Sequence, residues 1–227
     1  MLLFFDAAAI LESLMEYSVI GPDEILGEKP FTDPELTWRE AKVMRGMLAR
    51  ERERAQAWQE DPGAQVGAQI ERRSDDQECR HLLVVPDRRA LLQANGLTAV
   101  GFFSRPREGV DHSVLYELED ELVTRMADYA AVGLLSYYDL EFVKGAYGNL
   151  VLFSTPDVPK EWSADAVHRR AVEISPGHYH EVRLHRGSID GGLLDGGDLT
   201  IVSTRYFDFK SPTIWQGLRR FDSTPGG

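Results

Sequence analysis

The segment HYHEVRLHRG, residues 178–187, holds three of the six histidines of the chain, together with one glutamate and two arginines. It is predicted to be a β-strand, in which alternate side chains point to opposite faces of a sheet. If Val182 and Leu184 face a layer of helices, the odd-numbered side chains face the other way. Buried charges are costly unless they are paired, so such a row indicates either mutual pairing or a ligand-binding site. The row consists of Tyr179, Glu181, Arg183 and His185.

Acid/base catalysis is the chemistry that this row offers. His185 is a candidate general acid or base, because the pKa of an ordinary histidine lies near neutrality. Glu181 is a candidate to orient the imidazole, and Arg183 is a candidate to hold a substrate carboxylate or an enolate-like oxyanion in its planar fork. The competing interpretation is that Glu181 and Arg183 pair with each other, and that His185 is a hydrogen-bonded histidine at the rim of the sheet.

Polar side chains on the neighbouring predicted strands are candidates for substrate binding. Which of them share a face with His185 depends on the strand register, which the sequence leaves open. The candidates are Tyr179, Tyr137, Asp139, Asn149 and Arg205, and Asp139 is a second candidate to orient His185.

A metal site is a weaker hypothesis. His178 and His180 stand two residues apart on one face of the predicted strand, and they would need a third ligand to hold a metal ion. His168 falls at the margin of the apolar face of a predicted helix. The sequence contains no CxxCH, HExxH or paired CxxC motif. No metal site is therefore predicted, and these three histidines stay weak candidates.

The first 81 residues are predicted to be a helical extension followed by a linker. Residues 1–17 are expected to form an amphipathic helix capped by Asp6. A second helix is expected to begin at Thr37, with Glu40 at the capping-box position. Residues 60–80 are polar and without a period, as is typical of a linker or loop. The apolar stripe of the second helix consists of Val43, Met44, Met47 and Leu48.

Residues 82–227 are predicted to form an α+β domain. Runs with strand character alternate with segments of helical period, and turn residues separate them. The order from residue 97 to residue 209 is β-α-β-β-α-β-β, which gives an antiparallel sheet with both helices on one face. The expected ranges are 97–103, 111–130, 133–142, 149–154, 163–174, 178–186 and 199–209.

This order of elements resembles the dimeric α/β-barrel superfamily of ferredoxin-like proteins. In that superfamily two subunits press their sheets together and enclose a cavity, and its members include cofactor-free monooxygenases, polyketide cyclases, haem-containing dismutases and aldoxime dehydratases. The resemblance covers about half of the chain and rests on element order. It implies a homodimer with a cavity under the sheet. By analogy with the haem-containing members alone, it also implies haem as a cofactor, with His168 or His185 as the axial ligand.

Composition limits the classes of partner. The formal net charge of −12 argues against nucleic acids and anionic membrane surfaces, which require a basic face. The apolar start of the chain lacks a positive region and is interrupted by Asp6 and Glu12, so neither a signal peptide nor a membrane span is predicted. The single cysteine, Cys79, lies in a polar run and is expected to be an exposed free thiol, which favours a cytoplasmic location.

The function expected from these observations is the binding of a small organic molecule in a cavity under the sheet of a cytoplasmic homodimer. As an enzyme, the protein would carry out acid/base or oxygenation chemistry, as a monooxygenase, cyclase or lyase acting on a conjugated or carbonyl-bearing substrate. Two alternatives stay open. One is a haem- or metal-dependent enzyme on the same scaffold, and the other is a non-catalytic binding or assembly module that uses the N-terminal helices.

Overall fold

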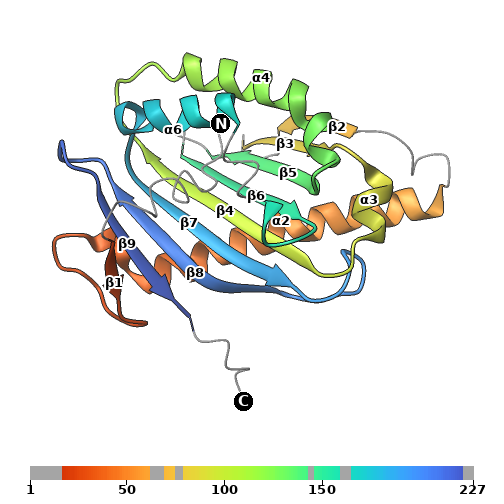
Figure 1. Ribbon diagram of the computed structural model, residues 1–227, viewed down its shortest axis with the longest axis horizontal. Helices are drawn as coiled ribbons and strands as arrows, with labels where there is room; N and C mark the ends of the chain where they lie inside the picture. The colour runs from red at the N-terminus through yellow and green to blue at the C-terminus, as the bar shows by residue number, and fades with distance from the viewer. Residues whose placement is uncertain (1–16, 62–68, 75–78, 143–145, 159–164, 222–227) are drawn as a thin grey trace.

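The chain forms an α+β fold around one open, mixed β-sheet (Figure 1). The structure is a computed structural model and describes residues 17–61, 69–74, 79–142, 146–158 and 165–221. Within these residues the sheet has nine strands in the order β1-β9-β8-β7-β4-β6-β5-β3-β2. The strands are β1 (Ser18–Ile20), β2 (Gln69–Ser74), β3 (Arg80–Val85), β4 (Leu97–Pro106), β5 (Leu134–Glu141), β6 (Tyr147–Phe153), β7 (Tyr179–Ile189), β8 (Leu199–Asp208) and β9 (Trp215–Arg220). The helices are α2 (Pro34–Glu60), α3 (Arg88–Gln93), α4 (Ser113–Ala130) and α6 (Ala166–His178), with a 3-10 turn, η1 (Pro30–Thr32).

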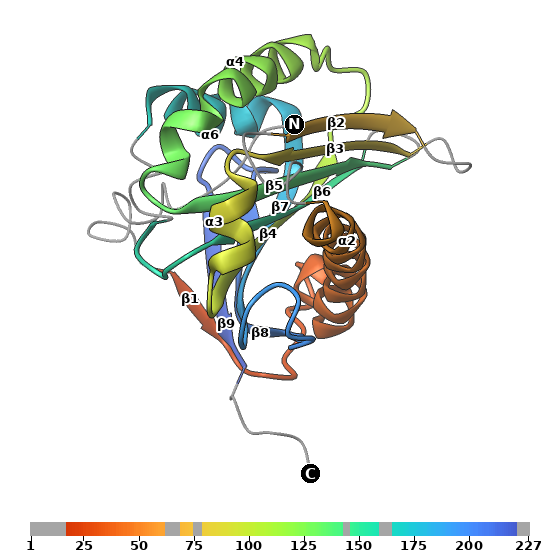
Figure 2. The ribbon, with the colours of Figure 1, turned by 90° about the vertical axis from the view of Figure 1, so that its right-hand side faces the viewer.

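Helices cover both faces of the sheet, α4 and α6 on one side and α2 on the other (Figure 2). Val182 and Leu184 of β7 are buried in the apolar core under α4 and α6. Met44 and Met47 of α2 are buried in a second core on the opposite face. Gly101 of β4 allows this close approach, because a Cβ atom there would lie 2.5 Å from the sulfur of Met44. The sheet is thus the middle layer of three.

The apolar stripe predicted for α2 is confirmed, whereas the predicted capping box is wrong. Helix α2 begins at Pro34, and the side chain of Asp33 accepts a hydrogen bond from the backbone N–H of Glu35. Proline at the first helical position lacks the N–H that would otherwise need a partner there, so Asp33-Pro34 starts the helix before Thr37. Glu40 is therefore free of any capping role and can reach the sheet.

The expected elements between residues 97 and 209 are present, with boundaries that shift by a few residues. Four strands, β1, β2, β3 and β9, lie outside the predicted ranges. Residues 60–80, expected to be a linker, contain β2, and the C-terminal segment contains β9. The predicted helix at residues 1–17 lies almost wholly outside the described residues. The division of the chain at residue 82 stays a prediction, but β1, β2, β3 and α2 from the first 85 residues belong to the same sheet assembly as the rest.

The two-subunit barrel also stays a prediction. The sheet is open, and the face expected to meet a second subunit is covered by α2 of the same chain. Cys79 corrects a further expectation, because the thiol is buried rather than exposed. In the described part of the chain, no helix has both the length and the apolar character needed to cross a membrane.

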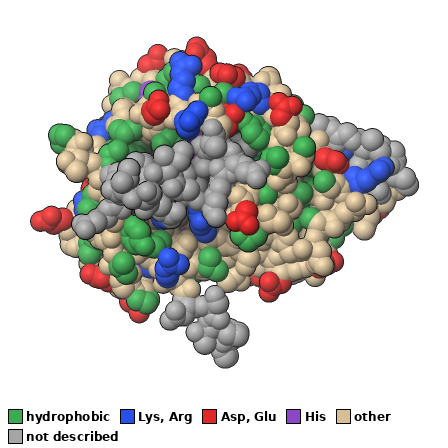
Figure 3. Space-filling model, viewed as in Figure 1, with side chains coloured by type: hydrophobic (Ala, Val, Ile, Leu, Met, Phe, Trp, Pro, Cys, Tyr) green, Lys and Arg blue, Asp and Glu red, His purple; other side chains and the backbone are tan. Residues whose placement is uncertain are grey.

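The outer surface of α4 is solvated and charged. Acidic and basic side chains are interspersed along the upper edge of the molecule in Figure 3, where α4 lies. This pattern suits a helix that packs on the sheet with one face and meets water with the other. The exposed acidic residues of α4 include Glu117, Asp120, Glu121 and Asp128.

One carboxyl group lies inside the core between α2 and the sheet. The side chain of Glu51 is 1% exposed, and its Oε2 atom accepts a hydrogen bond of 2.7 Å from the hydroxyl of Ser136 on β5. Burial raises the pKa of Glu51 from 4.5 to about 8, which the bond from Ser136 only partly opposes. Glu51 is therefore protonated in the folded protein at neutral pH.

We predict that replacing Glu51 by glutamine stabilises the protein at neutral pH. Between pH 4.5 and about 8 the folded protein holds a proton on Glu51 that the unfolded chain releases, so the free energy of unfolding falls as the pH rises through this window. Glu51→Gln should remove this fall and raise the free energy of unfolding at pH 7 by roughly 2–4 kcal/mol. Urea denaturation between pH 5 and pH 9 measures both effects. Glu53→Gln, an exposed control on the same helix, should change little, and a destabilised Glu51→Gln variant would contradict the assignment.

Candidate functional site

Arg183 and His185 of β7 lie on the α2 side of the sheet, where strand parity predicted them. Both side chains meet the carboxylate of Glu40, which extends from the first half of α2. The Nε and Nη2 atoms of Arg183 donate to Oε1 of Glu40 at 2.9 and 2.6 Å, and Nε also lies 2.9 Å from Oε2. The planar guanidinium fork that was expected to hold a substrate anion is thus occupied by a carboxylate of the protein itself.

The imidazole of His185 is fully buried and is held at both nitrogens. Its Nε2 atom lies 2.8 Å from Oε2 of Glu40, and its Nδ1 atom lies 2.9 Å from the hydroxyl oxygen of Thr204 on β8. An ionised carboxylate can only accept hydrogen bonds, so Nε2 carries the proton in this contact. The ring of Phe103 packs at 5.5 Å from the imidazole centroid. Any proton exchanged between His185 and a ligand on the other side of Glu40 must pass through that carboxylate.

Glu40 is ionised although its side chain is only 12% exposed. Burial acts to raise its pKa, but the charge of Arg183 and the hydrogen bond from His185 outweigh this effect, and the pKa lies below its usual value of 4.5. Burial likewise acts to lower the pKa of Arg183, and Glu40 reverses the effect. The pKa shifts of Glu40 and Arg183 therefore both favour the charged forms, and the pair stays charged at neutral pH.

Glu181 is also buried on this face, as predicted, but it does not contact His185 in any described bond. It lies 3.6 Å from Nη1 of Arg183 and forms further ion pairs with Arg105 and Lys210 at 3.3 Å. The orienting role expected of Glu181 belongs geometrically to Glu40 and Thr204. The pairing of Glu181 with Arg183, which was the competing interpretation, is present but secondary to the fork on Glu40.

A pocket of about 250 Å³ opens beside this cluster, between the first half of α2 and the sheet. Its polar end is formed by the side chains of Glu40 and Arg183, and the exposed Arg39 also borders it. The remaining wall is apolar or aromatic. It consists of Leu36, Val43, Phe103, Phe142 and Ala146; Tyr147 also borders the pocket, but its ring lies on the opposite face against Tyr116 of α4.

Three of the predicted substrate-binding residues lie on the opposite face, under α4. Tyr137 and Asp139 of β5 and Asn149 of β6 are buried there. Asp139 and Asn149 stand directly opposite each other on the two neighbouring strands. Tyr137 donates a hydrogen bond of 3.3 Å to Glu119 of α4, and Oδ1 of Asn149 accepts one of 2.9 Å from the backbone of Phe102. Burial raises the pKa of Asp139 to about 8. These groups form a separate polar cluster and do not meet His185.

Tyr179 and Arg205 also fall on the α4 and α6 face, because two irregularities reverse the strand parity. Helix α6 runs on to His178, and the register of β7 on β4 passes from Tyr179 to Glu181, which leaves one extra residue between them. Similarly, Val202 is an extra residue in β8, so Arg205 pairs with Leu184 and shares its face. A single inserted residue moves every side chain beyond it to the other face.

The weak metal candidates are dispersed. His178 is buried at the end of α6 and packs on His112 at 5.3 Å, His180 is half-buried, and His168 is fully buried within α6. Among the described residues, no three His, Cys, Asp or Glu side chains stand close enough together to hold a metal ion. His185 does not fit the role of a haem ligand, because both of its ring nitrogens are engaged by protein groups.

Glu40 is the functional residue that sequence reasoning missed, and the sequence does contain a signal for it. Residues 40, 44, 47, 51, 55 and 58 follow one another at helical spacing on the buried side of α2. Four of these positions hold Met, Ala or Trp, and two hold glutamate. A glutamate within a buried stripe must either pair with a cation on the facing element or carry a proton itself.

We predict that Glu40→Ala destabilises the protein by roughly 3–5 kcal/mol at neutral pH, because it removes the main partner of the buried guanidinium of Arg183 and leaves only the longer contact with Glu181. Chemical denaturation measures this loss. The matched control is Glu35→Ala on the same helix, which removes an exposed ion pair with Arg39 and should cost at most about 1 kcal/mol. Since the folded-state pKa of Glu40 is lowered, its contribution is complete above pH 4.5 and disappears as the pH falls through the folded value. An equal loss in both variants would contradict the buried pair.

Comparison with known proteins leaves the geometry as the only guide to function. No family model, no curated protein and no solved structure matches the chain.

Proposed function

We propose that the protein binds a small, largely apolar organic molecule in the pocket between α2 and the sheet. The observation that carries this proposal is the composition of the pocket, in which an apolar and aromatic wall ends at the buried pair of Glu40 and Arg183. Small-molecule sites are typically apolar cavities with a few fixed polar groups that set the orientation of the ligand. The carboxylate edge of Glu40 is the group that a polar atom of the ligand would meet.

The fold supports this location. The strand order β7-β4-β6-β5, with α4 and α6 on one face, supports the ferredoxin-like relationship proposed from the sequence. In the superfamily that the chain resembles, a second subunit covers the remaining face. We propose that α2 takes that place within one chain, so that the pocket is formed without a partner. A homodimer would then form through other surfaces of the chain, and light scattering would detect it.

The burial of the α2 stripe argues against the assembly-module alternative. That alternative required an exposed apolar stripe to dock a partner, and Met44, Met47 and Leu48 are instead at most 1% exposed. Val43 is half-buried because it lines the pocket. In the described part of the chain, the predicted stripe is therefore not exposed for a partner to dock on.

Acid/base catalysis is the second candidate function, and the contact of 2.8 Å between His185 and Glu40 favours it. In such a reaction Glu40 would contact the substrate. His185 lies on the far side of Glu40, where it would hold the carboxylate in position and exchange a proton with it. Oxygenation chemistry on the same ligand class stays a proposal from the resemblance alone.

We predict that indole binds in this pocket and that Val43→Trp abolishes the binding. Indole is a neutral aromatic molecule whose single N–H can donate to Glu40. The tryptophan side chain would fill the space over Phe103, so the affinity for indole should fall at least about tenfold. Saturation-transfer NMR and calorimetry measure the binding. Ala49→Trp, on the exposed side of the same helix, is the control and should bind indole as the wild type does. Equal binding by both variants would remove the pocket from the proposal.

For the acid/base candidate, we predict that the protein accelerates exchange of the α-protons of cyclohexanone in deuterium oxide. His185→Gln should abolish the acceleration, and proton NMR measures the exchange. A parallel denaturation curve must show that the variant is folded. A folded His185→Gln variant that exchanges these protons as fast as the wild type would exclude His185 from the mechanism.

A further inference from the structure

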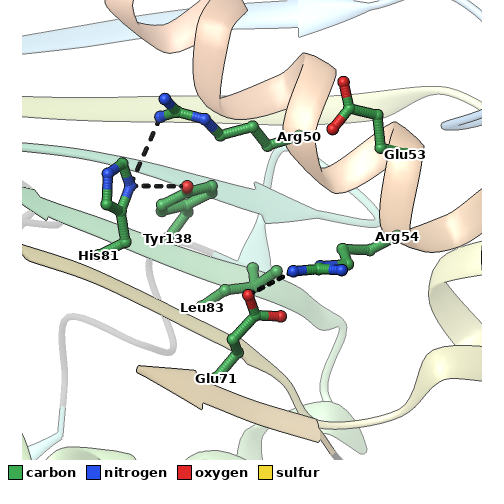
Figure 4. Close-up of a pocket in the computed structure, with 7 residues that line it drawn as sticks. All are labelled: Arg50, Glu53, Arg54, Glu71, His81, Leu83 and Tyr138. Carbon is green, nitrogen blue, oxygen red and sulfur yellow. Dashed lines mark hydrogen bonds and ion pairs between the residues drawn. The ribbon is translucent and has the colours of Figure 1, made fainter. Parts of the chain in front are cut away.

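A second pocket, of about 170 Å³, lies further along α2, between the helix and the edge strands of the sheet (Figure 4). It is separate from the pocket beside Glu40 and Arg183, and the two pockets share no lining residue. In Figure 4 the guanidinium of Arg50, the imidazole of His81 and the hydroxyl of Tyr138 gather on one side, and Arg54 and Glu71 pair on the other. The lining residues are Arg50, Glu53, Arg54, Glu71, His81, Leu83 and Tyr138.

Arg50 differs from the other arginines of α2. Arg39, Arg45 and Arg54 each form an ion pair with a carboxylate, and Arg52 donates to the carbonyl oxygens of Leu193 and Gly197. In the described part of the chain, Arg50 instead makes a single contact, in which Nη1 lies 3.5 Å from Nδ1 of His81. That contact is at the outer limit of a hydrogen bond. Most of the guanidinium therefore faces the pocket with its donors available.

His81 and Tyr138 form a rigid floor beneath Arg50. Both side chains are buried, and Nδ1 of His81 lies 2.9 Å from the hydroxyl oxygen of Tyr138. The two rings also pack edge to face, with their centroids 5.8 Å apart. Leu83 of the same strand as His81 adds an apolar surface beside them. A ligand held by Arg50 would place its carbon atoms against this floor.

The charges of the pocket favour a ligand with a single negative charge over one with two. The positive charge of Arg54 is matched by Glu71 at 2.6 Å, which leaves Arg50 as the cation with unmatched charge. The carboxylate of Glu53 also borders the pocket and would repel a second negative charge on the ligand. A carboxylate is the singly charged group whose geometry matches the guanidinium fork.

We propose that this pocket binds a small aliphatic monocarboxylate, whose two oxygens accept hydrogen bonds from Arg50 and whose chain lies against Leu83 and Tyr138. The probe for this site is butyrate, and butanol serves as the uncharged ligand with the same carbon chain. Inorganic phosphate serves as the anion with a higher charge.

The test is an NMR titration that follows the side-chain N–H of Arg50 and the ring of His81 at constant ionic strength. Butyrate should give saturable shifts of both groups, whereas butanol should give none and phosphate should bind at least about tenfold more weakly. Arg50→Gln should weaken butyrate binding, followed on His81, by at least about tenfold. Arg45→Gln removes an arginine of the same helix that pairs outside the pocket, and it should leave the binding unchanged.

Arg50→Lys separates charge from geometry. This variant keeps the positive charge and loses the fork, so its affinity should lie between those of the wild type and Arg50→Gln. Linear shifts without saturation, undiminished binding in a folded Arg50→Gln variant, or tighter binding of phosphate than of butyrate would each overturn the proposal.

Discussion

The pairing of Glu40 with Arg183 fixes where α2 lies on the sheet. Two charges that leave water must find each other, and separating them inside the protein costs several kcal/mol. A shift of α2 by one helical turn, about 5.4 Å, would withdraw Glu40 from both Arg183 and His185. The close contact of Met44 with Gly101 opposes the same shift, so apolar packing and the ion pair specify one position for the helix. Since α2 supplies one wall of each pocket, the shape of both pockets depends on this pair.

The two buried glutamates of α2 show how a partner decides the protonation state. Glu40 and Glu51 stand three helical turns apart on the same side of one helix. Glu40 faces a guanidinium and an imidazole, and its pKa is lowered despite burial. Glu51 faces the hydroxyl of Ser136, which cannot balance a full charge, and its pKa rises to about 8. The two glutamates therefore attach the helix to the sheet in different ways, Glu40 through an ion pair and Glu51 through a neutral hydrogen bond.

The sequence was sufficient to predict the strand parity of residues 182–185, but not the irregularities on either side. Val182 and Leu184 alternate with Arg183 and His185, and any sheet that buries one pair places the other on the opposite face. The reversal at Tyr179 depends on how far α6 continues, and that is decided by tertiary packing rather than by local propensity. The extra residue at Val202 in β8 depends on its partner strand, which no local pattern encodes.

Long-range pairing explains the remaining differences. The short strands β1, β2 and β9 lie toward the edges of the sheet, and each has too few alternating residues to be recognised without its neighbour. Glu40 could have been found from its position in the buried stripe of α2, but the identity of its partner could not. Arg183 lies 143 residues away along the chain, and only the folded topology brings the two together.

The presence of pockets beside α2 follows from the relative widths of a helix and a sheet. A helix with its side chains is about 10 Å across and covers roughly two strands at a spacing of about 4.8 Å. The α2 face of the sheet is wider than this, so strands on the flank of the helix are reached only by its long side chains. Arg50 and Arg54 extend toward β3, β5 and β2 in this way, and Leu36, Glu40 and Val43 face the ends of β4, β6 and β7. Space stays open where these side chains meet polar partners rather than a close-packed apolar surface, which is why each pocket has a charged group at one end.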